Sequence, residues 1–175
     1  MTQSLILAGL LMTAPFTCII AAEEASHGHV AAHGGCLNEL GECENGHAEV
    51  KIDDKKFRLW FVGGGTQTTK AVRVAAASIT LTTKVESGKP AQTITLTAKP
   101  LTLAEEKVGD CSYFEGEADW LKDVKRLTLT GKVLFKGSET AIMIEWPNGY
   151  DSDQDEKGAD KKKDNKESKP APVSK

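Results

Sequence analysis

The chain has 175 residues, of which 39% are hydrophobic and 6% are aromatic. This content supplies one modest core at the length of a single domain, and it excludes a protein that crosses a membrane several times. Lysine and arginine together number 22 against 25 aspartates and glutamates, which gives a formal net charge of −3. That balance argues against a general nucleic-acid binder, because such a protein neutralises phosphates with a basic surface.

Residues 1–22 predict a secretory signal peptide. They carry an uncharged apolar run that ends in Ala21 and Ala22, and the acidic Glu23 follows directly. An apolar run before a small-residue cleavage site is typical of exported proteins. We therefore expect cleavage after residue 22, no stable membrane span afterwards, and a periplasmic or secreted protein. Cys18 leaves lipoprotein anchoring as an alternative.

Residues 151–175 predict a disordered C-terminal tail. Charged side chains of both signs dominate this segment, and apart from its prolines Ala159, Ala171 and Val173 are the apolar residues in it. Such a segment cannot bury enough apolar surface to offset the loss of chain entropy on folding.

The central region, residues 36–150, predicts a β-sandwich domain. Apolar residues recur there at every second position, as in the runs around Phe57, Leu81 and Leu129. This period of two is typical of strands with one buried face. Short strands separated by turn signals, without long helices, favour an all-β, immunoglobulin-like sandwich of about 7–9 strands over a barrel. The glycines at 63–65 fall between two strands, so we interpret them as a hairpin loop and not as a phosphate cradle.

A histidine-rich stretch ahead of this domain carries the main chemical signal. All four histidines lie between positions 27 and 47, and residues 23–35 are also rich in glycine, which predicts a flexible segment. Imidazole and thiolate groups bind zinc and copper, and close spacing on a flexible chain lets several of them converge. We therefore predict a copper or zinc site. The candidate ligands are His27, His29, His33, Cys36 and His47.

The cysteines predict a disulfide, because disulfides persist in the oxidising compartments outside the cytoplasm. Three cysteines remain after cleavage of the signal peptide. Cys43 and Cys111 each lie just outside a predicted strand, so we expect a bridge between them. Pairing of Cys36 with Cys43 is the alternative.

Three stretches of the chain carry a family resemblance. They are HGGCLNELGECENGHAEVKIDDKKFRLWFVGGG, AVRVAAASITLTT and CSYFEGEADWLKDVKRLTLTGKVLFKG. Together they resemble small exported bacterial proteins of uncharacterised function, in which a His-Gly-Gly segment precedes a β-domain. They are also similar to periplasmic domains that accompany heavy-metal efflux membrane-fusion proteins. The resemblance covers roughly residues 29–150, matches at His33, Gly34 and Gly35, and implies an envelope protein linked to metal handling.

No catalytic motif with a partnered base or nucleophile is present in the sequence, so we expect no enzymatic activity. The sequence predicts an exported, non-enzymatic envelope protein that binds copper or zinc through its N-terminal His/Cys segment. The alternative is a structural or protein-interaction module of the envelope, with a protein partner, no metal role and incidental histidines.

Overall fold

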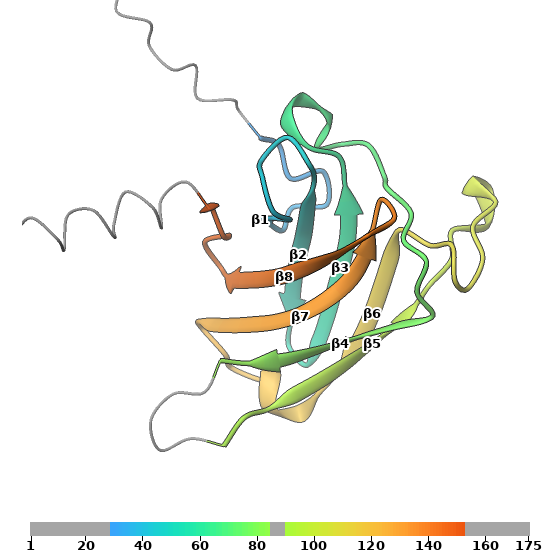
Figure 1. Cartoon of the computed structure of the whole chain (residues 1–175). Helices are drawn as coiled ribbons and strands as arrows, with labels where there is room; N and C mark the ends of the chain where they lie inside the picture. Colours follow the sequence, from blue (N-terminus) through green and yellow to red (C-terminus); the bar gives the residue numbers. More distant parts are fainter. Residues whose placement is uncertain (1–28, 85–89, 153–175) are drawn as a thin grey trace, which may run out of the picture.

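The computed structural model describes residues 29–84 and 90–152 (Figure 1). The predicted signal peptide with Cys18, the candidate ligand His27 and the charged tail from residue 153 lie outside the described residues. Within the described ranges, the structure has no helix with the length and apolarity needed to cross a bilayer.

Eight antiparallel strands form one continuous sheet in the order β1-β2-β3-β6-β5-β4-β7-β8. The strands are β1 (Cys36–Glu39), β2 (His47–Asp53), β3 (Lys56–Val62), β4 (Ser78–Thr83), β5 (Thr93–Ala98), β6 (Tyr113–Glu117), β7 (Leu127–Phe135) and β8 (Ser138–Trp146). Three short 3-10 helices lie between them: η1 (Gly65–Gln67), η2 (Thr102–Ala104) and η3 (Asp119–Leu121). The all-β class is thereby confirmed, and the strand number lies within the predicted range.

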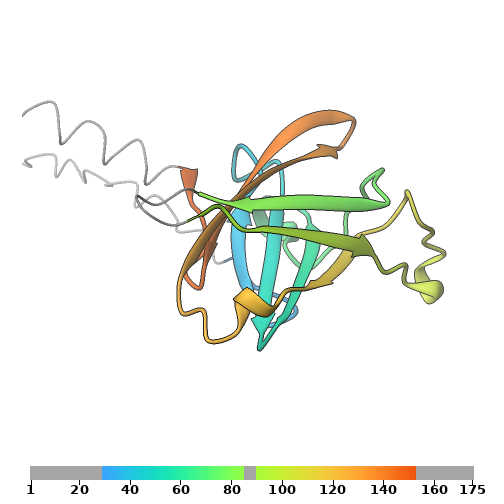
Figure 2. The same cartoon turned by 90° about the horizontal axis from the view of Figure 1, so that it is seen from below.

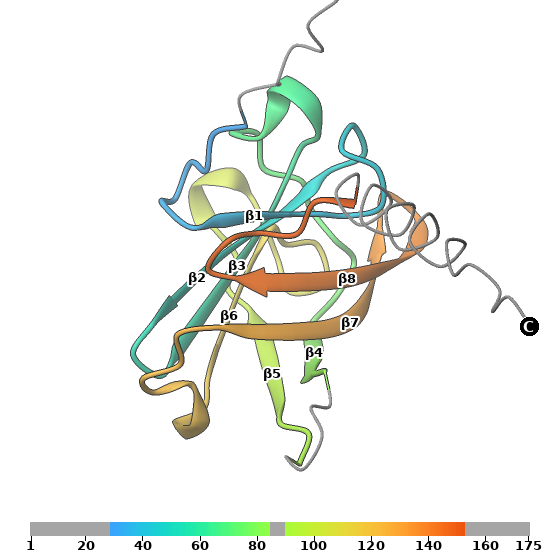
Figure 3. The same cartoon turned by 90° about the vertical axis from the view of Figure 1, so that its left-hand side faces the viewer.

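The sheet curls on itself until its edge strands β1 and β8 lie side by side (Figure 3). As Figure 1 shows, β7 and β8 cross in front of β2 and β3 at a steep angle. The two halves face each other across a shared core as the layers of a sandwich do, but the ladder of hydrogen bonds runs through all eight strands. The loop that contains η2 projects away from the sheet (Figures 1 and 2).

The core explains why the period-two runs form these strands. Alternate residues of β4 and β5 are buried and exposed in turn, with Ile79, Leu81 and their partners facing inward. At the centre the Phe61 ring meets Phe114 edge-on, with the ring centroids 5.8 Å apart, and lies 5.9 Å from Phe135. Aromatic burial of this kind is a large part of the stability of a domain.

Asn38 connects the two edges of the sheet. Its side chain is fully buried, and its Nδ2 donates to the carbonyl oxygen of Ala48 at 3.2 Å. Its Oδ1 accepts hydrogen bonds from the backbone amides of Glu145 at 2.7 Å and Tyr150 at 3.0 Å. One side-chain amide therefore bridges β1, β2, β8 and the chain that follows β8.

The outer face of β2 is also buried, and residues 29–35 cover it. Along β2, Ala48 and Val50 point into the core, so His47 and Glu49 point to the opposite face, yet both are at most 2% exposed. The Gly35 amide donates to Glu49 Oε1 at 3.0 Å. A Cβ on Gly35 would lie 2.3 Å from the Val50 carbonyl oxygen, so only glycine fits this approach. The segment predicted to be flexible thus makes specific contacts with the sheet from His29 onward.

Candidate metal centre

Three potential metal ligands converge at one end of the sheet. One ligand atom from each of His29, Cys43 and His47 lies within 4.8 Å of the others. The Nε2 atom of His29 is 3.2 Å from the Sγ atom of Cys43, and the rings of His29 and His47 have centroids 4.8 Å apart. We call these three side chains the HCH cluster.

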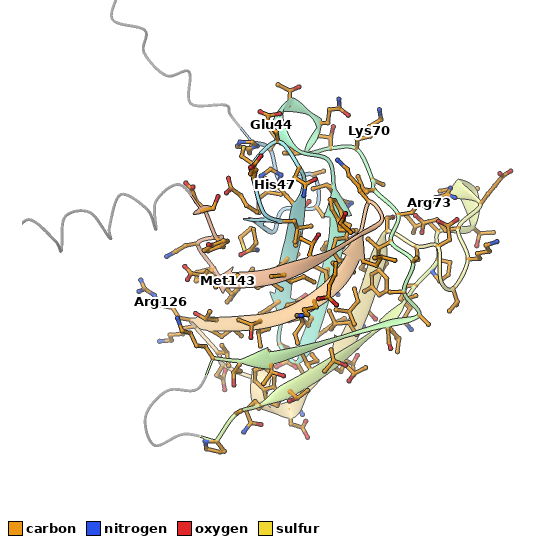
Figure 4. All side chains as sticks on the ribbon, in the orientation of Figure 1. Glu44, His47, Lys70, Arg73, Arg126 and Met143 are labelled. Carbon is orange, nitrogen blue, oxygen red and sulfur yellow. The ribbon has the colours of Figure 1, made fainter. Side chains whose placement is uncertain are left out.

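Each member of the HCH cluster comes from a different structural element. His47 begins β2 on its outer face, Cys43 lies in the loop between β1 and β2, and His29 is in the segment that covers that face. The backbone after β3 supports the cysteine loop, because the Gly65 amide donates to the Cys43 carbonyl at 3.2 Å. In Figure 4 the labelled His47 and Glu44 lie together at this end of the molecule.

His47 has the hydrogen bond that is usual for a histidine ligand. Its Nδ1 lies 3.2 Å from the carbonyl oxygen of Gly63. Since a carbonyl can only accept, Nδ1 carries the proton and Nε2 keeps its lone pair free for a metal ion. Burial lowers the pKa of His47, which favours the neutral, coordinating form of the imidazole.

The electrostatic environment of the HCH cluster is suited to a cation. Burial raises the pKa of the Cys43 thiol, and the negative charges of Glu39 and Glu44 raise it further. A divalent ion reverses this effect, because it attracts the thiolate and compensates the two carboxylates. The Nδ1 atom of His29 is buried and has no hydrogen-bond partner among the described residues. An imidazole binds one ion through one nitrogen, so an ion held beside the Cys43 sulfur by Nε2 leaves this Nδ1 to another partner.

The distances suit a small ion that binds nitrogen and sulfur. Ligand atoms on a tetrahedral zinc ion lie about 3.4–3.7 Å apart, given Zn–N and Zn–S bonds of about 2.1 and 2.3 Å. The 3.2 Å between His29 Nε2 and Cys43 Sγ is slightly shorter than this range, and the 4.8 Å that encloses all three ligand atoms is longer, so small side-chain rotations would fit the HCH cluster around an ion. His29, Glu39 and His47 also line a surface cavity of about 380 Å³, through which an ion can reach the HCH cluster from solvent.

The structure brings together two of the five predicted ligands, His29 and His47, and places two others elsewhere. His33 Nδ1 is 2.8 Å from Glu49 Oε2, and the His33 ring stacks on Trp60 at 4.3 Å. Cys36 is buried, with its thiol 3.8 Å from the Glu145 carbonyl oxygen. His27 lies outside the described residues.

Cys43 is the functional candidate that the sequence assigned to another role. The expected Cys43–Cys111 disulfide is absent, and so is the alternative with Cys36, since these three described cysteines are all free thiols. Cys111 is buried on another part of the sheet, where its thiol donates to the Tyr113 carbonyl at 3.0 Å. The Cys-x3-His spacing from Cys43 to His47, at the entrance to a strand, is the signal that could have identified the pair.

Three stacked rings hold His33 in place, and one of them, Tyr113, has a shifted pKa that can be measured. Trp60 lies between His33 and Tyr113, with a Trp60–Tyr113 centroid distance of 4.9 Å. Burial and a hydrogen bond from the Tyr113 hydroxyl to Glu115, 2.6 Å long, raise the pKa of Tyr113 to about 12.

Replacing Glu115 with glutamine is expected to move the pKa of Tyr113 down toward its ordinary value of about 10, because the repulsion between phenolate and carboxylate is then lost. The measurement is a titration of phenolate absorbance in the native protein. Tyr113→Phe is the control, because it must remove the high transition. A high transition that persists unchanged in Glu115→Gln would contradict the assigned cause.

The positions His33, Gly34 and Gly35, which carry the family resemblance, belong to the segment that covers β2. Their contacts with Glu49 and Val50 explain why histidine and glycine suit these positions, but they do not test the resemblance. No family model, curated protein or solved structure matches the chain.

Proposed function

We propose that this protein is an exported, non-enzymatic envelope protein that binds a zinc or copper ion through His29, Cys43 and His47. The observation that carries the proposal is the convergence of two imidazoles and a thiol, within 4.8 Å, from three separate parts of the chain. Export is supported by the signal-like character of residues 1–22.

Three further observations support an ion at this place. His47 has a free Nε2 and a carbonyl partner on its other nitrogen. The Nε2 atom of His29 lies 3.2 Å from the Cys43 sulfur. Carboxylates beside Cys43 favour a positive charge there. The soft thiolate and borderline imidazoles select zinc or copper over magnesium or calcium, which prefer oxygen ligands.

Titration calorimetry of the purified protein with Zn(II) and with Cu(I) tests the proposal. We expect micromolar or tighter binding of one ion per chain. Cys43→Ser and His47→Gln are each expected to weaken it by at least about 100-fold, since loss of a ligand should exceed the 10- to 100-fold effect of an outer-shell partner.

Two variants serve as matched controls. His33→Ala removes a neighbouring imidazole and Cys111→Ser a thiol outside the HCH cluster, so both are expected to bind the ion as the unmodified protein does. The metal role would be rejected if the unmodified protein bound no ion, or if Cys43→Ser and His47→Gln bound the ion as tightly as the unmodified protein does. That result would favour an envelope interaction module with incidental histidines.

A further inference from the structure

A carboxylate lies on the same face of the sheet as His47. Glu39, the last residue of β1, is the direct partner of His47 in the β1–β2 ladder. Side chains of directly opposed residues share a face of the sheet, with their Cβ atoms about 4.5–5.5 Å apart. Both side chains are buried and line the same cavity as His29.

The charge of Glu39 acts on two members of the HCH cluster. Its charge and hydrogen bonding raise the pKa of the Cys43 thiol, and its charge opposes the lowering of the His47 pKa that burial causes. Glu39 is not among the side chains whose ligand atoms lie within 4.8 Å of one another, so its carboxylate must turn toward the HCH cluster to reach an ion held there. A tetrahedral ion has four coordination positions, and the HCH cluster fills three of them.

Glu39 also holds the chain that follows β8. Its Oε2 accepts hydrogen bonds from the Ser152 amide at 2.9 Å and from the Ser152 hydroxyl at 2.6 Å. A carboxylate that turns toward the HCH cluster has to give up both of these hydrogen bonds. The Glu39 carboxylate can therefore bind either Ser152 or the ion.

We propose that Glu39 is the fourth ligand of the ion bound by the HCH cluster, and that Ser152 competes with the ion for this carboxylate. The inference rests on the proposed function and specifies the coordination of that site. A fourth, oxygen ligand favours Zn(II), which is typically four-coordinate and accepts carboxylates. Cu(I) prefers soft ligands such as thiolates, so an added oxygen ligand raises its affinity little.

The competition links the ion to the contact made by Ser152. An ion that binds Glu39 weakens the contact between Glu39 and Ser152. The Ser152 contact weakens ion binding by the same factor, because the coupling between two binding equilibria is reciprocal. Zinc is therefore expected to release Ser152 from the end of β1.

The test compares Zn(II) affinities of three variants with that of the unmodified protein. Glu39→Gln keeps the shape of the side chain and is expected to lose at least about 10-fold in affinity. Ser152→Ala is expected to bind Zn(II) about 3- to 10-fold more tightly, since charge-assisted hydrogen bonds no longer hold the carboxylate. Glu44→Gln is the control for charge alone, with a change below about 3-fold expected for an exposed carboxylate.

Cu(I) and Co(II) supply independent readouts. Cu(I) affinity is expected to stay the same in Glu39→Gln. The visible spectrum of Co(II) is expected to change in Glu39→Gln, where water replaces the carboxylate, and to stay the same in Glu44→Gln. Equal losses in Glu39→Gln and Glu44→Gln, or Zn(II) binding that Ser152→Ala weakens, would overturn the proposal. If the unmodified protein binds Zn(II) and Glu39→Gln binds it equally well, the fourth ligand is rejected while the HCH cluster stands. If the unmodified protein binds no ion, the proposed function fails as well.

Discussion

Replacing Asn38 with alanine is expected to lower the free energy of unfolding by about 3–5 kcal/mol, because it removes the three shortest hydrogen bonds of this fully buried side chain at about 1–3 kcal/mol each without full additivity. The lost bonds are those to Ala48, Glu145 and Tyr150. A loss of this size is a large part of the total stability of a small domain, which is about 5–15 kcal/mol.

Denaturant unfolding, followed by tryptophan fluorescence, measures the effect of this substitution. Asn45→Ala is the matched control, because the Asn45 amide donates a single bond, 2.9 Å long, to the Leu40 carbonyl oxygen. We expect this control to cost about 1 kcal/mol. Equal losses in the two variants would show that Asn38 does not connect the edges in the way described.

Gly64→Ala is expected to affect stability and the HCH cluster together. A Cβ at Gly64 would lie 2.2 Å from the Glu44 carbonyl oxygen and 2.7 Å from that of Cys43. Both contacts are with backbone, so the loop that carries Cys43 must move. We expect a loss of about 1–3 kcal/mol in unfolding free energy from the overpacking. We also expect a loss of at least about 10-fold in zinc affinity, because metal sites tolerate little displacement of a ligand.

Calorimetry and denaturant unfolding of the same preparation separate the two effects of Gly64→Ala. Gly137→Asn is the control, because nothing lies within 4 Å of an added Cβ there and asparagine tolerates the positive φ of this turn. Unchanged zinc affinity in a destabilised Gly64→Ala protein would mean that the position of the cysteine loop does not control the site.

The strands could be predicted from the sequence because their signal is local. Alternation of buried and exposed residues, as at Ile79 and Leu81, follows directly from the geometry of a strand. The meeting of the two edge strands, β1 and β8, has no such signal. It depends on Asn38 reaching Glu145, which is more than one hundred residues away in the chain.

The candidate site was only partly predictable, for a related reason. The residue types predict a metal site, and His29 and His47 are two predicted ligands that the structure brings together. The chemistry of a side chain is visible in the sequence. Which side chains a residue contacts in the fold is not visible in the sequence. His33 binds Glu49 and not a shared ion, since residues 29–35 cover β2, and covering of this kind leaves no periodic pattern. Cys43 was assigned to a disulfide because the expected compartment is oxidising.

The triple glycine after β3 shows the same limit. Its place between strands predicts a hairpin loop. The chain forms a loop with η1 that a single bridge between Val62 and Ala71 closes, but the strands on either side, β3 and β4, do not pair with each other. The close approach of Gly64 to the backbone of Cys43 and Glu44 appears only once the fold brings the two loops together.

The meeting of β1 and β8 also bears on self-association. A sheet ordinarily presents unpaired amides and carbonyls at both edges, and such edges recruit strands from other molecules into fibrils. Here the Asn38 side chain occupies the Glu145 amide, and the Glu39 amide donates to the Tyr150 carbonyl oxygen. Some backbone groups of each edge strand are thus already hydrogen-bonded and cannot pair with a strand of another molecule. A foreign strand can reach these groups only after the seam has opened, so the same contacts that stabilise the monomer also protect it from polymerising.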